Sequence, residues 1–211
     1  MEDNAGTERA LENFIRQKTS EGIVFYQGAP DSLLIKAEAG LSPFKFTYEL
    51  KALYQCCNGA ESDKLVFGIA NFISLEAALD KRSEMVRVAE DFGLHWPPAL
   101  FPIGEWNSAL LLAILRRENS RCSEILYIDI GSGDLLATLE FGSLKLLLDV
   151  VTGTRDFLCE YGGSSYEAFN RLQEKKFPDR YEKSQKGTTS KNGVTNVFDI
   201  ADPNRLPKSW F

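Results

Sequence analysis

The chain has 211 residues, of which 44% are hydrophobic and 26% are charged, a balance typical of a folded domain and not of a disordered chain. Its 24 Lys and Arg against 30 Asp and Glu give a net charge of −6, which argues against a protein that coats nucleic-acid phosphates. The longest apolar run, Ala109–Leu115, is far shorter than the roughly 20 residues that cross a bilayer. The acidic start carries no secretion signal. We therefore expect a cytoplasmic protein without membrane or direct nucleic-acid contact.

The first third of the chain alternates short helices with a strand. Thr7 is placed to cap a first helix, and residues 22–28 are typical of a strand. Residues 31–40 predict a second helix that ends at a glycine. Residues 45–57 predict a third, because their apolar side chains recur every three or four positions, and Asn58-Gly59 is expected to end it.

The middle and the end of the chain predict further strands and helices. Residues 64–69 are typical of a strand, and Ser74 opens a helix to about residue 92. A proline-rich loop then leads into a buried strand at 109–115, and the clearest hairpin of the chain surrounds a turn at 131–134. Helices are expected from Leu144 and over 166–177.

A polar linker precedes an apolar C-terminal tail that we expect to dock on the domain. The order of elements predicts an α+β fold with a single mixed or antiparallel sheet flanked by helices. We divide the chain into an N-terminal helix and strand extension (1–29), a core domain (30–160), and a C-terminal helix, linker and tail (161–211).

Residue types that carry chemistry are few. Cysteines stand at 56, 57, 122 and 159 with no CxxC pair, so reduced thiols are expected and a zinc site is not. His95 is the single histidine, and a Cys-His or Ser-His-Asp mechanism would have to use it. The interpretation is a protein with no catalytic residue, no cofactor and no metal. An enzyme that uses Cys56 or Cys57 is the alternative.

Several motifs follow one another in a characteristic order. A short helix with an Ile…Glu pattern leads through a proline to a helix ending in Asn-Gly; then come "LVFGIANFISLEAAL" and "WPPALFPIGEW". This succession, over residues 30–160, resembles the SUKH superfamily, which contains bacterial immunity proteins, the Syd protein and a fungal regulator of cell-wall synthesis. The main core and capping positions of the match are Ile35, Glu38, Pro43, Asn58, Gly59, Pro102 and Gly104.

The chain departs from the family after "PIG". The family usually carries a Gly-Gly-Asp-like turn there, whereas this sequence continues "EWNSALLLAIL" and keeps acidic character only at Glu105. We expect partner contact around Glu105, Trp106 and Asn107, in a loop entering the strand, and on the neighbouring hairpin at Asp134. Trp106 has a second interpretation, as a ring that covers the core.

The resemblance implies a non-enzymatic protein-binding domain. Its expected role is that of an immunity protein whose partner is a toxin domain, such as a nuclease, which it neutralises by surface complementarity. The acidic balance agrees with a basic partner, because opposite charge speeds association. The alternative is a regulatory scaffold of the kind found among the fungal relatives, which joins host proteins and neutralises nothing. The oligomeric state is left open by the sequence.

Overall fold

The structure is a computed structural model, and it describes residues 4–61, 63–132, 135–161, 164–176, 197–202, 204 and 206–211. The α-helices are α1 (Asn4–Ser20), α2 (Asp31–Leu41), α3 (Tyr48–Cys56), α4 (Leu75–Asp91), α5 (Leu144–Tyr161) and α6 (Ser165–Lys176). The strands are β1 (Phe25–Gln27), β2 (Cys57–Ala60), β3 (Leu100–Trp106), β4 (Ala109–Ile114), β5 (Ile125–Asp129), β6 (Leu136–Phe141) and β7 (Val197–Asp199). Within the described residues, 3-10 turns are formed by η1 (Ile130–Ser132) and η3 (Lys208–Trp210).

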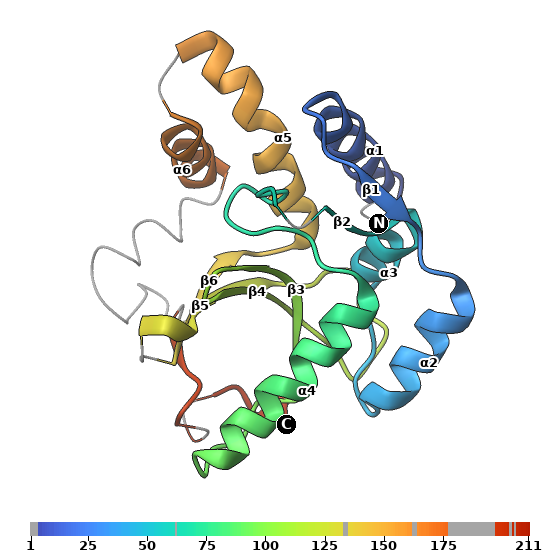
Figure 1. The fold of residues 1–211 in the computed structure, drawn as a ribbon, viewed down its shortest axis with the longest axis vertical. Coiled ribbons are helices and arrows are strands. Elements are labelled where there is room, and N and C mark those ends of the chain that lie inside the picture. The colour runs from blue at the N-terminus through green and yellow to red at the C-terminus, as the bar shows by residue number, and fades with distance from the viewer. Residues whose placement is uncertain are drawn as a thin grey trace.

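The predicted α+β fold is confirmed. Strands β3 to β7 form one antiparallel sheet in chain order, and β1 and β2 form a separate two-stranded sheet. Figure 1 shows α4 along one side of the large sheet and α1, α5 and α6 gathered at its other end. Strand β4 is buried along its whole length, which explains its unbroken apolar sequence. No helix within the described residues is long and apolar enough to cross a membrane.

Residues 64–69 are not a strand, so that prediction is wrong. They form turns, and the side chains of Val66 and Phe67 are buried in the hydrophobic core. The Phe67 ring stacks on Phe14 of α1 at 5.8 Å and lies 5.3 Å from Phe72. A short apolar run without alternation indicates burial, and it does not distinguish a strand from a buried loop.

The first helix also differs from the prediction. It has already begun at Asn4, so Thr7 lies buried inside α1 and caps nothing at its start. Helix α1 packs on α3 and α5, and β1 pairs with β2 at the end of α3. The N-terminal segment is thus joined to the rest of the fold by a helix face and by a strand.

The C-terminal segment packs on the same sheet. Strand β7 pairs with β6, and Trp210 is buried with its ring 4.8 Å from that of Phe198. The backbone carbonyl of Trp210 accepts a hydrogen bond from Ala99, next to the start of β3, at 3.2 Å. The last described residues therefore contact both the first and the last strands of the sheet.

A buried carboxylate, that of Glu49, joins three parts of the chain. Glu49 lies in the first turn of α3 and accepts hydrogen bonds from the backbone N–H groups of Ser123 (3.2 Å), Leu144 (3.0 Å) and Lys145 (3.4 Å). Leu144 and Lys145 open α5, so the carboxylate caps a helix far away in sequence. Burial raises the pKa of Glu49 above its usual value, and these hydrogen bonds, with one from Cys122, reduce the rise.

We predict that Glu49→Gln lowers the free energy of unfolding by about 1–3 kcal/mol at pH 7, because an amide nitrogen would face backbone donors. The raised pKa makes the unfolded chain lose this proton first as the pH rises. The carboxyl's contribution to stability is therefore complete below about pH 4.5 and declines as the pH rises through the folded-state pKa. The deficit of the variant should thus be larger at pH 5 than at pH 7 in urea unfolding.

The control for this measurement is Glu90→Gln, since Glu90 is exposed on α4. It should change the free energy of unfolding by less than about 0.5 kcal/mol at both pH values. A Glu49→Gln deficit that shrinks on acidification would contradict the assigned role.

Candidate functional site

The predicted partner-contact residues lie at one end of the large sheet. Glu105 and Trp106 are the last residues of β3, where Trp106 pairs with Ala109 of β4. The expectation of a loop is therefore wrong here, because β3 and β4 form a tight hairpin that turns at Asn107 and Ser108. Asn107 is exposed and adopts a left-handed backbone with φ of 54°, which asparagine tolerates better than most residues.

The structure brings this hairpin turn to the connection between β5 and β6. The Ser108 hydroxyl donates to Asp129 at 3.0 Å, and the Ser108 carbonyl accepts from Ile130 at 2.9 Å. Ile130 opens η1, whose chain continues toward Asp134. Asp134 lies outside the described residues, so its predicted role as a contact remains a prediction.

Glu105 belongs to a small charge cluster with α4. Its carboxylate lies 3.2 Å from Lys81, and Lys81 also contacts Glu84 at 2.9 Å. The hydrogen bonds that Lys81 donates to Glu84 and Glu105 raise the pKa of Lys81. One cation is thus shared by two partly exposed carboxylates, and the local charge is negative.

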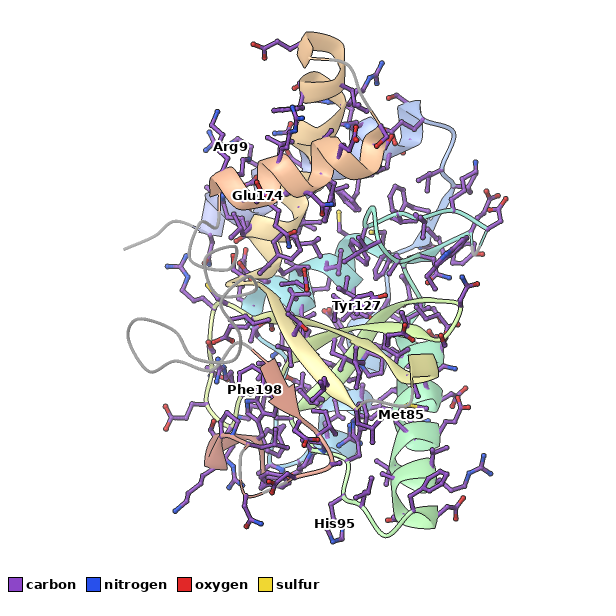
Figure 2. The ribbon with its side chains drawn as sticks, turned by 90° about the vertical axis from the view of Figure 1, so that its left-hand side faces the viewer. Arg9, Met85, His95, Tyr127, Glu174 and Phe198 are labelled. Atoms are coloured by element: carbon purple, nitrogen blue, oxygen red, sulfur yellow. The ribbon has the colours of Figure 1, made fainter. Side chains whose placement is uncertain are left out.

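A groove with a volume of about 710 Å³ lies between α4 and the C-terminal segment. Its α4 wall consists of Met85, Val88, Ala89 and Phe92, which follow one face of the helix. The opposite wall includes Leu136 of β6 and Ile200, just after β7. Figure 2 shows Met85 and His95 on the α4 side and Phe198 of β7 across from them.

Two large apolar side chains at this groove are exposed to solvent. Phe92 is 76% exposed and Leu136 is 44% exposed, although Met85 of the same lining is 8% exposed. Aromatic and aliphatic side chains that protrude beside a preformed apolar groove are typical of protein contact sites. The sequence indicated the hairpin turn as a contact surface, but it gave no indication of this α4–β7 groove.

The alternative chemistry at the vicinal cysteines has little support in the geometry. Cys57 is buried and its thiol donates to the Leu53 carbonyl at 3.7 Å, whereas Cys56 is exposed. Desolvation raises the pKa of both thiols, and Glu12 raises that of Cys56 further. A raised pKa leaves little thiolate, the nucleophilic form, at neutral pH. Among the described residues no group of His, Cys, Asp and Glu is placed to hold a metal ion.

Three of the motif positions on which the family resemblance rests, Ile35, Glu38 and Pro43, lie in or next to α2. Ile35 is 67% exposed on α2, so its expected place in the core is wrong; Leu34 and Ala37 form the buried face instead. Glu38 accepts from the Phe46 backbone N–H at 3.0 Å and pairs with Lys51 at 3.0 Å. It thereby holds the loop that contains Pro43 against α3.

Asn58 and Gly59 do not end a helix, which corrects that prediction. Helix α3 ends at Cys56, and Cys57 is already extended because it enters β2. Asn58 instead starts the next helix: its side-chain oxygen accepts from Leu75, the first residue of α4, at 2.7 Å. Gly59 has φ of +92° and lies so close to α4 that a Cβ would be 2.7 Å from the Ser74 nitrogen.

Pro102 and Gly104 surround a bulge in β3. Pro102 opposes Leu112 and Gly104 opposes Leu111, so Ile103 between them is left out of the ladder with β4. The Ile103 carbonyl accepts from Ile73 at 3.3 Å on the other side. A Cβ on Gly104 would be 2.4 Å from the Asn71 carbonyl oxygen, so this close approach requires glycine.

The chain was compared with protein-family models and with curated proteins. No family model matches it, and no curated protein matches it. Its function is therefore inferred from its residues, its motifs and their arrangement.

We predict that Gly59→Ala lowers the free energy of unfolding by more than about 2 kcal/mol, because it combines a left-handed backbone with a contact inside the packing distance. Gly40→Ala is the matched control: α2 continues through Gly40, where an added Cβ meets nothing within 4 Å. It should stabilise the protein by roughly 0.5–1 kcal/mol. Equal effects of the two changes in urea unfolding would refute the close packing of Gly59 against the start of α4.

We also predict that Phe92→Ala changes the free energy of unfolding by less than about 0.5 kcal/mol, since the ring is mostly in water. Met85→Ala, seven positions earlier on the same face of α4, should cost about 2–4 kcal/mol because Met85 is buried. Thermal or urea unfolding of both variants checks this. A large loss at Phe92 would mean that the ring serves the fold and is not available for binding.

Proposed function

We propose that this chain is a non-enzymatic protein-binding domain of the SUKH type, and that it acts as an immunity protein that neutralises a toxin domain by covering it. The observation that carries the proposal is the α4–β7 groove, with Phe92 exposed at its edge. Binding energy in protein interfaces concentrates in a few large side chains that fill preformed pockets. A groove with a protruding ring offers both parts of such a contact.

The family motifs support the scaffold of this proposal. Asn58 and Gly59 seat the start of α4 against β2, and Gly104 lets the segment before α4 approach β3. These motif residues therefore position α4, the helix that provides one wall of the groove. In this interpretation the motif residues that resemble the family serve to build the binding surface, and they do not contact the partner themselves.

Neutralisation by occlusion agrees with the chemistry of the described residues. An inhibitor that covers a toxin needs shape and charge complementarity and no activated nucleophile. The net charge of −6 favours a basic toxin such as a nuclease, because opposite charges steer the encounter and raise the association rate.

The test is co-expression with each reading frame next to the gene of this chain that inhibits growth when expressed alone, with growth and co-purification as readouts. The wild type should restore growth and form a complex. Phe92→Asp should weaken the complex at least about thirtyfold, which corresponds to the roughly 2 kcal/mol of an interface hot spot. Ile35→Asp is the matched control, since Ile35 is equally apolar and 67% exposed, but on α2.

Two outcomes would contradict the proposal. Absence of both rescue and a complex would exclude neutralisation of that toxin. Recovery of host proteins in its place, with no effect on a toxin, would favour the regulatory-scaffold alternative.

A further inference from the structure

The edges of the α4–β7 groove carry negative charge next to its apolar lining. On α4, Glu84 precedes Met85 and Asp91 precedes Phe92; both lie within one turn of Val88 and thus along the same side of the helix. Both carboxylates are exposed. Lys81 of α4 is already shared between Glu84 and Glu105. Arg87, three residues after Glu84 and four before Asp91, is exposed, and within the described residues it forms no ion pair with either carboxylate.

The opposite wall contributes a further carboxylate. Asp199 lines the groove at the end of β7, and its Oδ1 accepts from the Ala201 backbone N–H at 3.0 Å. No cation in the part of the chain that the structure describes forms an ion pair with Asp91 or Asp199. The apolar floor therefore lies between two walls that each carry negative charge.

We propose that the groove binds a segment of the partner protein in which large apolar side chains are flanked by lysine or arginine. This inference rests on the proposed function for the identity of the groove as a partner contact, and it adds the chemistry of the segment bound there. The apolar side chains cover Val88, Ala89 and Ile200 of the lining. The cations reach the carboxylate of Asp199, which lines the groove, and that of Asp91, which precedes the lining residue Phe92 at the end of α4.

Charge decides against the other occupants of an apolar groove. An uncharged segment would cover these carboxylates without giving them a partner, and a charged group that loses water without compensation is costly. A second copy of this chain carries the same net charge of −6 and would place carboxylates against carboxylates. A basic segment avoids both the uncompensated burial of the carboxylates and the repulsion between like charges. The carboxylates at the edges of the groove therefore favour a basic segment over neutral and acidic ones.

The test uses three synthetic peptides that share the same leucines at helical spacing and differ only at the positions between them, which are lysine, glutamine or glutamate. Each is titrated into the full-length protein, with Trp96, which lines the groove, as the fluorescent reporter. The lysine peptide should bind at least about tenfold more tightly than the glutamine peptide, and the difference should shrink as salt is added. The glutamate peptide should bind most weakly.

Variants of the protein test whether the preference for lysine arises from the carboxylates at the groove. Asp91→Asn with Asp199→Asn replaces one carboxylate oxygen of each residue by an amide nitrogen and removes two charges, so it should weaken the lysine peptide about fivefold. It should not weaken the glutamine peptide, because that peptide then no longer covers an uncompensated charge. Asp63→Asn is the control, because Asp63 is exposed in a turn outside the groove. Phe92→Ala should weaken all three peptides.

Equal affinity for the lysine and glutamine peptides would overturn the inference and indicate a site for apolar groups alone. An equal loss with Asp63→Asn would overturn it as well, since overall charge would then explain the binding. If the lysine preference holds and toxin rescue fails, the groove chemistry stands and the proposed function falls. If rescue succeeds without a lysine preference, the proposed function stands and the inferred groove chemistry is wrong.

Discussion

The burial of the Glu49 carboxylate is the constraint on which the arrangement of the helices depends. A charge removed from water must receive hydrogen bonds, and Glu49 receives them from the approach to β5 and from the first turn of α5. The position of α5 relative to α3 is thereby set. Helices α1 and α6 both pack on α5, so their positions follow from it. The buried contact of Gln173 in α6 with Glu140 in β6, at 2.9 Å, completes the link back to the sheet.

Local sequence patterns predicted helix caps and hairpins correctly where the interactions that determine them lie within one stretch of the chain. Ser74 caps α4 as predicted, through a hydrogen bond from Ala77 at 3.2 Å, and the hairpin of β5 and β6 lies where its alternating residues indicate. Predictions failed where two elements meet. Cys57 lies in β2 and pairs with β1 and is not in the predicted helix, and residues 64–69 form turns in which Val66 and Phe67 are buried, with the Phe67 ring against α1. Tertiary partners outweighed local propensity in both places.

The candidate site was only partly predictable for the same reason. Glu105, Trp106 and Asn107 do lie together at a hairpin turn beside η1, and a departure from the family pattern pointed to them. Phe92 gave no comparable indication. It lies three residues after the buried Ala89 on one helix face, so its spacing predicts burial, and nothing in the sequence shows that the surrounding surface stops short of it. Ile200 joins the groove from more than a hundred residues away in the chain.

The origin of one groove wall in the C-terminal segment has a thermodynamic consequence. Asp199 and Ile200 line the groove in the arrangement in which β7 is paired with β6 and the Trp210 carbonyl accepts a hydrogen bond from Ala99. A partner that touches this wall binds the docked arrangement better than any undocked one, and linkage makes the effect reciprocal. Occupancy of the groove and docking of the last residues then strengthen each other by the same free energy. The C-terminal segment is in this sense part of the proposed binding site and part of what binding there would stabilise.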